Sequence, residues 1–205
     1  VPEQYPSIQS AINASQDGDV ISVGDNHIEG FINGLTNITI AGRTEDSVTI
    51  DAQGLSACAA FPISEVTFVN INFENADDGT GAVGSCRQSN YENCRFKNCT
   101  TTSDGGGVVS TNGNNGGLGN YLFKNCTFEN CTGPRGGALS DGDNIINFVI
   151  DSCTFTSCSA TSDGGAIWVN RGRLEVVDSF FYNCSSEGNG GAIIATTLPN
   201  GCTIK

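Results

Sequence analysis

Cysteines arranged around phenylalanine are the residues of this sequence whose type and spacing most suggest chemistry. Three copies of a C-x-F-x-x-C phrase carry complete pairs: Cys94/Cys99, Cys126/Cys131 and Cys153/Cys158. Four more cysteines lie outside such pairs and would form two further bridges if each copy pairs internally: Cys58, Cys86, Cys184 and Cys202. The count of ten is even, no C-x-x-C pair occurs, and His27 is the only histidine. These features predict disulfides in an oxidising compartment rather than a metal site.

Three arrangements of the sulfur atoms are compatible with the sequence. In the copy around Phe73 both cysteine positions are lost together, which favours pairing within one copy. Against it, five residues of extended chain span about 16 Å, whereas a disulfide needs Cα atoms within about 7 Å, so a turn before the second cysteine is required. Pairing between stacked copies, about 4.8 Å apart, would join Cys99 to Cys131 and Cys158 to Cys184, and would leave the first column uneven. The third arrangement is buried free thiols.

Six N-x-[ST] sequons agree with secretion and are candidates for N-linked glycan: Asn13, Asn37, Asn98, Asn125, Asn130 and Asn183. Four of them have cysteine at the middle position and belong to the repeated phrase. The alternative for these four is that the repeat needs asparagine for its turn. If the source is eukaryotic, we expect glycan on at least one sequon, with Asn37 and Asn98 favoured.

Trp168, Arg171 and Arg173 are the candidates for contact with a carbohydrate. An outward-facing indole at Trp168 would provide a flat apolar surface for a sugar ring. The alternative is an aromatic side chain packed at an edge of the fold. For the two arginines, which flank Gly172, the alternative is a solvated turn.

Composition and charge exclude several classes of partner. The chain has nine Lys and Arg against 22 Asp and Glu, for a formal net charge of −13, which argues against nucleic acid and anionic lipid. No apolar run approaches the roughly 18–20 residues of a membrane span. With the cysteines and sequons, these features predict an extracellular, secreted or cell-surface protein that neither binds nucleic acid nor inserts into a membrane.

The phrase recurs down the chain with a period typical of a solenoid. Aligned on phenylalanine, its copies lie at Phe73, Phe96, Phe128, Phe155 and Phe181, in steps of 23 to 32 residues. The residue after each glycine pair gives a second series: Ala82, Gly107, Ala138, Ala166 and Ala192. Two series that lengthen and shorten together indicate one structural unit with loop insertions.

The unit reads as strand, because short β-branched or aromatic runs such as FVIDSCTF alternate with Asn, Asp, Ser and Gly. We therefore predict one all-β domain over residues 1–205, a right-handed parallel β-helix of about seven coils, with its repeats over 65–205. The phenylalanines would stack inside it. Ile8, Ala11 and Ile12 have helical spacing after Ser7, which predicts a short helix near residues 7–15 within an N-terminal cap over 1–20.

Two parts of the chain resemble known families. YPSIQSAINASQDGDVISV, NITIAG and VTIDAQG resemble the opening of right-handed β-helix proteins of the pectin lyase-like superfamily. The C-x-F-x-x-C and GGA[IV] units are similar to repeats of polymorphic outer-membrane-protein type in large surface adhesins. Together the resemblances cover most of the chain and imply a fold and an extracellular setting, but neither is specific for an activity.

The pectin-active relatives imply two chemistries: calcium-binding carboxylates with an Arg or Lys base, or paired Asp with Arg. The available acids are Asp77, Asp78, Asp104, Asp141, Asp143, Asp151, Asp163 and Asp178, and the bases are Arg135, Arg171 and Arg173. Most of these acids lie in turns beside glycine, where aspartate supports local backbone hydrogen bonds. We assign no catalytic residue and expect no cofactor, with calcium at DGDN, 141–144, as the alternative.

The regular repeat favours a non-catalytic, disulfide-stabilised structural or adhesive glycoprotein. The alternatives are a carbohydrate-binding module and a polysaccharide lyase or pectinesterase-like enzyme acting on acidic polysaccharide. The chain stops at TTLPNGCTIK within what reads as another coil, and an uncovered β-helix end exposes unpaired backbone groups. We therefore expect head-to-tail self-association into filaments or a surface layer, with a longer parent chain as the alternative; glycans or cell-surface components are the other expected partners.

Overall fold

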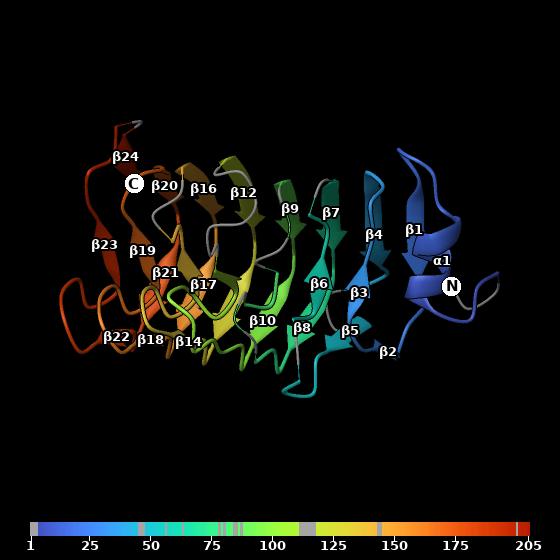
Figure 1. The fold of residues 1–205 in the computed structure, drawn as a ribbon, viewed down its shortest axis with the longest axis horizontal. Coiled ribbons are helices and arrows are strands. Elements are labelled where there is room, and N and C mark those ends of the chain that lie inside the picture. The colour runs from blue at the N-terminus through green and yellow to red at the C-terminus, as the bar shows by residue number, and fades with distance from the viewer. Residues whose placement is uncertain are drawn as a thin grey trace.

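In the computed structural model the chain winds into a parallel β-helix, as the repeat predicted. Figure 1 shows strands stacked side by side along one long axis, with the only labelled helix at the N-terminal end. The structure describes residues 4–44, 48–55, 57–62, 64–77, 79, 81–83, 86, 88–110, 118–142, 145–199 and 201–205. Its two largest sheets contain eight and seven strands, and the solenoid has about six turns, where about seven were expected.

The first sheet contains one strand from each turn, and all neighbours are parallel. Its order is β1 (Val20–Val23), β4 (Ile38–Gly42), β7 (Glu65–Val69), β9 (Gln88–Glu92), β12 (Leu118–Lys124), β16 (Ile145–Asp151), β20 (Arg173–Val177) and β24 (Cys202–Ile204). Buried and exposed residues alternate along these strands, because successive side chains of a strand point to opposite faces. One face of the sheet therefore lines the interior.

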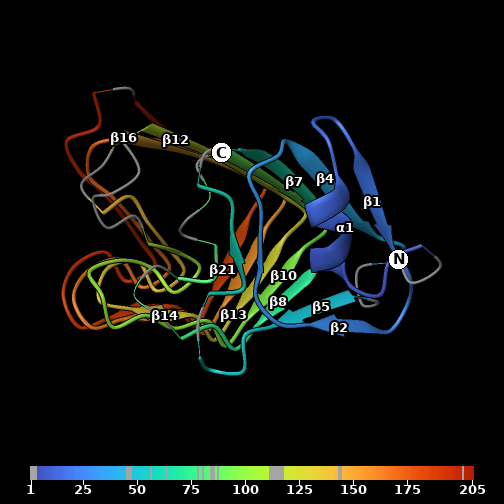
Figure 2. The same cartoon turned by 45° about the vertical axis from the view of Figure 1, so that its right-hand side comes forward.

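The second sheet is also parallel and contains the phenylalanine of each repeat. Its order is β2 (His27–Glu29), β5 (Val48–Asp51), β8 (Asn72–Glu74), β10 (Arg95–Lys97), β13 (Thr127–Glu129), β17 (Thr154–Thr156) and β21 (Phe180–Tyr182). Figure 2 shows the first and second sheets on different sides of a common interior. In β10, β13 and β17 the middle residue is buried and its two neighbours point outward, which defines an outer face of the second sheet.

Shorter strands complete each turn. The third sheet consists of β11 (Val109–Ser110), β15 (Leu139–Ser140), β19 (Ile167–Val169) and β23 (Ile193–Ala195). The remaining strands are β14 (Thr132–Gly133), β18 (Ser159–Ala160) and β22 (Ser185–Ser186) in one sheet, and β3 (Ile32–Asn33) and β6 (Ala59–Ala60) in another. The corners on either side of the second sheet are made by residues with positive φ, mostly asparagine.

The predicted phenylalanine column is confirmed. Phe73, Phe96, Phe128, Phe155 and Phe181 pair in register through the second sheet. Their rings stack at centroid distances of 5.0, 5.0, 4.2 and 4.7 Å along the series. A second aromatic column, which the sequence analysis missed, runs along the first sheet through Phe68, Tyr91 and Phe123, with edge-to-face contacts to the first column. The core is therefore a double stack of rings.

The predicted glycine series is wrong by one residue in its first two members. The backbone N–H of Val83 donates to the carbonyl of Val108, and the N–H of Val108 donates to the carbonyl of Ala138. Val83 and Val108 therefore occupy the positions assigned to Ala82 and Gly107. At Gly107 the run DGGGVV offers two glycine pairs, and counting from the first pair shifts the alignment; Ala82 follows GTG, where no adjacent glycine pair marks the position.

The N-terminal helix closes one end of the solenoid, as expected. Helix α1 (Ile8–Ala14) begins after Ser7, whose side chain and that of the serine three residues on form reciprocal capping hydrogen bonds. The carboxylate of Glu29 accepts hydrogen bonds from the backbone N–H groups of Ile8 and Gln9, at 2.5 and 2.8 Å. Negative charge at a helix N-terminus is stabilising, so this contact fastens the cap to β2. His27, which the sequence analysis left without a role, lies 2.9 Å from the same carboxylate.

Candidate functional sites: cysteine columns and an exposed sheet face

Seven of the ten cysteines stack in two interior columns that flank the second sheet. The first cysteine column is Cys94, Cys126 and Cys153, directly before β10, β13 and β17. The second cysteine column is Cys99, Cys131, Cys158 and Cys184, which follow β10, β13, β17 and β21. Six of these side chains are buried and Cys184 is half-buried. The turn residue before each cysteine has positive φ, and this corner directs the next side chain inward.

Sulfur contacts run along these columns from coil to coil. Burial and the neighbouring thiols of Cys158 and Cys99 raise the pKa of Cys131, whereas the thiols of Cys131 and Cys184 lower the pKa of Cys158 to about 4. In the first column, the backbone N–H of Cys126 donates to the sulfur of Cys153, at 3.4 Å. Each thiol in the two columns also lies 3.4 to 3.8 Å from the carbonyl oxygen of an aromatic residue one coil toward the N-terminus. The columns therefore bring together cysteines from different copies.

Within a copy, the second-sheet strand and its phenylalanine lie between the two cysteines. Cys94 precedes β10 and Cys99 follows it, and Phe96 projects into the interior between them. The turn at Asn98, with φ of 53°, comes only after the strand has ended. This geometry favours pairing between copies over pairing within one copy. All ten cysteines are free thiols in this structure, so disulfide formation stays a prediction.

The other three cysteines lie outside the two columns. Cys58 and Cys86 are buried, and their thiols donate to the carbonyl oxygens of Glu74 and Ala59, at 3.5 and 3.9 Å. Burial raises the pKa of Cys86 to about 11 and raises the pKa of Cys131 well above the ordinary thiol value. Because the thiolate is the reactive form, the buried thiols of Cys86 and Cys131 are slow nucleophiles. Cys202, on β24, is exposed.

The four sequon asparagines of the repeat lie at the corners of the second sheet and belong to side-chain ladders. At one corner the amide of Asn125 donates to Asn93, at 3.3 Å. At the other, Asn130 donates to Asn98 at 3.4 Å, and Asn183 donates to Ser157 at 3.3 Å. Asparagine tolerates positive φ better than most residues, which gives the turn alternative a physical basis.

All six sequon asparagines are exposed, and glycosylation stays a prediction for each. The two outside the repeat lie near the cap. Asn13 accepts a hydrogen bond from the side chain of Gln9, and Asn37 accepts one from the backbone N–H of Glu65. In both residues the side-chain oxygen accepts a hydrogen bond, whereas a glycan would be attached to the side-chain nitrogen.

The outer face of the second sheet carries a shallow hollow of about 360 Å³. Its lining includes Arg95, Thr127, Glu129, Thr154 and Thr156. Arg95 pairs with Glu129 at 2.5 Å, and this hydrogen bond lowers the pKa of the glutamate. Hydroxyl, guanidinium and carboxylate groups therefore lie side by side on a flat, solvent-facing sheet.

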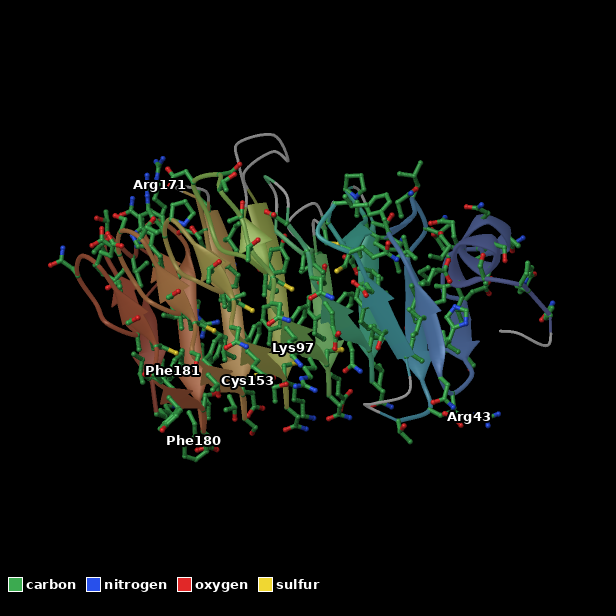
Figure 3. The ribbon with its side chains drawn as sticks, turned by 90° about the horizontal axis from the view of Figure 1, so that it is seen from below. Arg43, Lys97, Cys153, Arg171, Phe180 and Phe181 are labelled. Carbon is green, nitrogen blue, oxygen red and sulfur yellow. The ribbon has the colours of Figure 1, made fainter. Side chains whose placement is uncertain are left out.

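Two aromatic side chains continue this face at the C-terminal end. Phe180 is paired in register with Thr154, and Tyr182 with Thr156. Each aromatic is 71% exposed. Figure 3 shows Phe180 at the edge of this side of the molecule. The sequence analysis did not single them out, although FFY breaks the alternation of polar and apolar residues that the other copies keep.

Trp168 does not project as a stacking surface. It lies on β19, is 6% exposed, and carries the guanidinium of Arg135 at 4.6 Å from its ring centroid. Trp168 is therefore an aromatic side chain packed within the fold, and its ring makes a cation–π contact with Arg135. Arg171 is exposed, as Figure 3 shows, and Arg173 pairs with Glu175 at 2.6 Å. The three predicted sugar-contact residues therefore do not form one surface.

Asp141 is the most deeply placed of the predicted acids. It is fully buried, and one carboxylate oxygen accepts hydrogen bonds from the backbone N–H groups of Asn170, Arg171 and Gly172, at 2.9, 2.9 and 3.2 Å. Several N–H donors stabilise a buried carboxylate and order the loop that provides them. The role of Asp141 is therefore to hold the turn that leads into β20.

The remaining acids are distributed among separate turns. Asp104 pairs with Arg135, and backbone and side-chain hydrogen bonds from Asn189 lower the pKa of Asp163. Asp151 ends β16 and pairs in register with Val177, so Asp178 is not its equivalent but lies one residue further on, at the positive-φ corner after β20. Asp78 and Asp143 lie outside the described residues. The calcium candidate at 141–144 is therefore described only in part. Among the residues that are described, no group of three or more His, Cys, Asp or Glu side chains is placed to hold a metal ion.

Comparison with known proteins found no match. No family model, no curated protein and no solved structure matches this chain. Within the described part of the chain, no helix has the length and apolar character needed to cross a membrane. The class that the fold itself defines is a parallel β-solenoid with one short N-terminal helix.

Proposed function

We propose that this protein is a non-catalytic, extracellular structural or adhesive β-solenoid. The observation that carries the proposal is that like side chains pair along the axis, inside and outside. Phenylalanine rings stack at 4.2 to 5.0 Å, and corner amides of neighbouring coils bond at 3.2 to 3.4 Å. Such pairing stiffens a rod and uses polar groups to join coils.

Catalysis needs polar groups that converge on one reacting atom. Among the described carboxylates, the pKa of Glu129 is lowered by its arginine partner, and that of Asp163 by hydrogen bonds from Asn189 of the next coil. Both are surface contacts of the kind that joins coils. A rigid array in which each unit contacts its neighbours suits a scaffold that presents a repeated surface.

Two measurements test this proposal. Sugar release from pectin, alginate and related polymers, with and without calcium, should stay at the level of a blank; release above the blank overturns the non-catalytic assignment. Light scattering and negative-stain imaging over a concentration series test self-association and rod shape. We expect stiff particles of uniform width, and compact or flexible particles would contradict a scaffold role.

Carbohydrate binding is the second candidate, favoured by the outer face of the second sheet. The exposed rings of Phe180 and Tyr182 continue the threonine rows that line the hollow. Aromatic rings beside hydroxyl groups suit a sugar chain, which has apolar ring faces and polar edges. In a glycan array, Tyr182→Ala should abolish binding while Arg171→Ala, an exposed change elsewhere, should leave it intact. Equal loss from both variants, or no binding at all, rules the site out.

A further inference from the structure

The hollow on the outer face of the second sheet runs along the axis of the solenoid. Its lining residues come from β8, β10, β13 and β17, which are consecutive strands of this sheet. A further strand pairs on each side, β5 beside β8 and β21 beside β17, so the hollow lies on interior coils. Figure 3 views this side of the molecule, and Lys97 marks β10 on it.

The dimensions of the hollow suit a short, chain-like ligand. Three strand spacings of about 4.8 Å separate β8 from β17, which gives a length of about 14 Å. The volume of about 360 Å³ lies near the lower limit of the range of about 300–1,000 Å³ that is typical of ligand pockets. The hollow is therefore long and narrow, and a ligand that fills it lies along the axis.

Asn72 lies at the β8 end of the hollow and carries a polar group without a partner. It belongs to the outward row that continues with Arg95, Thr127 and Thr154, yet it is only 6% exposed. Its side-chain oxygen is shielded from solvent, and none of the described residues donates a hydrogen bond to it. A buried acceptor without a donor costs folding free energy, because its hydrogen bonds to water are lost. The packing of the fold gives no reason for an amide at this position.

Two threonine hydroxyls lie further along the same row. Thr127 and Thr154 pair in register on β13 and β17, and both line the hollow. Within the described part of the chain, neither hydroxyl is hydrogen-bonded to another residue. A hydroxyl both donates and accepts hydrogen bonds. The row therefore offers a fixed acceptor at one end and adaptable hydroxyls at successive strands.

The charges in the hollow cancel. Among its described lining residues, Arg95 is the cation and Glu129 is the carboxylate, and the two pair at 2.5 Å. A carboxylate or sulfate group on a ligand is an acceptor only, so it has no hydrogen to donate to the oxygen of Asn72. An ammonium group would compete with Arg95 for Glu129. A ligand that has hydroxyl donors and no charge meets neither obstacle.

We propose that this hollow is a subsite for a short neutral saccharide, which lies along the solenoid axis and donates a hydroxyl hydrogen to the side-chain oxygen of Asn72. Further hydroxyls of the saccharide pair with Thr127 and Thr154. A chain of hydroxyl-bearing rings suits this row, because polar groups recur along both. The inference rests on the carbohydrate-binding candidate function, and it adds the ligand class and the residue that selects a donor.

Asn72→Leu separates binding from folding, because the two expected effects have opposite sign. Leucine has a similar volume and no polar group, so chemical denaturation should show a variant at least as stable as the unaltered chain. Affinity for the saccharide should fall about tenfold, because the acceptor is lost. A purely structural role for Asn72 would not keep or raise stability while lowering affinity.

A matched pair of threonine variants tests the rest of the row. Thr154→Val keeps the shape of the side chain and removes the hydroxyl, so it should also weaken binding about tenfold. Thr39→Val makes the same change at an outward position of β4, on the first sheet, and should leave binding unchanged. Both threonines are half-buried, so the two variants differ in place rather than in exposure.

The binding measurement is isothermal titration calorimetry on the whole chain and on each variant. The probes are short oligosaccharides of glucose, mannose or galactose, each compared with a counterpart of the same length that carries uronic acid or sulfate. We expect the unaltered chain to bind a neutral oligosaccharide and to bind its charged counterpart more weakly.

The possible failures are distinguishable. Absence of binding to every saccharide overturns the carbohydrate-binding candidate and this subsite with it. Binding that is lost in Tyr182→Ala but unchanged in Asn72→Leu and Thr154→Val leaves the candidate function standing and rules out the hollow. Tighter binding of the uronic-acid or sulfated counterparts overturns the neutral ligand class.

Discussion

The central coils and the last coil share one repeated sequence motif, yet equivalent residues have different surroundings in each. Phe128 is fully buried between Phe96 and Phe155, with ring centroids at 5.0 and 4.2 Å. Phe181 occupies the same register position but stacks only on Phe155, at 4.7 Å, and is half-buried. The repeat therefore determines where a side chain lies, and the neighbouring coils determine how much it contributes to the free energy of unfolding.

The largest difference should come from removing a ring. Phe128→Ala leaves a cavity between two stacked rings and should cost about 3–5 kcal/mol of unfolding free energy. Phe181→Ala should cost about 1–2 kcal/mol, because less apolar area is buried there. Chemical denaturation followed by circular dichroism measures both. Equal losses would mean that the two coils are equally well packed and would remove the contrast.

Two glycines at turns of different coils test the same difference between the central and the last coil. A Cβ on Gly137 would lie 2.4 Å from the carbonyl oxygen of Gly165, whereas a Cβ on Gly191 would meet no atom within 4 Å. Gly137→Ala should therefore destabilise the fold by about 1–3 kcal/mol through overpacking against backbone, and Gly191→Ala should be nearly neutral. Thermal unfolding of both variants checks this. A stable Gly137→Ala would show that the coils can separate without much cost.

The asparagine ladder should give a smaller effect. Asn130 has φ of 53° and donates its amide to Asn98, so Asn130→Ala should cost about 1–2 kcal/mol through left-handed backbone strain and the lost hydrogen bond. Asn130→Gly keeps the conformation available and isolates the contribution of the amide. If both variants lose the same stability in urea, the ladder rather than the turn is responsible.

The smallest effect concerns charge on the exposed sheet face. Arg95 lowers the pKa of Glu129, so the ion pair stabilises the fold above the unfolded-state pKa of glutamate, and this contribution is lost as the pH falls through the lower folded-state pKa. Because both side chains are about one-third exposed, Glu129→Gln should cost about 1 kcal/mol or less at neutral pH. The difference between variant and unaltered chain should vanish in acid; a difference that persists there would not come from the charge.

Much of the fold was predictable because it is repeated locally. The phenylalanine column could be found from one residue type at a regular period. The second aromatic column could not, because Phe68, Tyr91, Phe123 and Ile150 share a position but not a residue type. Phe180 and Tyr182 were missed for a related reason: an aromatic run in the sequence suggests a core, and only the outward direction of these two side chains shows otherwise.

The sequence by itself determined the parallel β-helix, the corner positions and the N-terminal helix. These depend on strand periodicity, on the tolerance of asparagine for positive φ and on a helix cap, which are properties of a few neighbouring residues. Only the tertiary structure decided that cysteines of neighbouring coils stack in columns and that Trp168 is packed under Arg135. The partners in these contacts are 26 or more residues apart, so the contacts depend on how the coils stack, and spacing along the chain does not specify which groups come together.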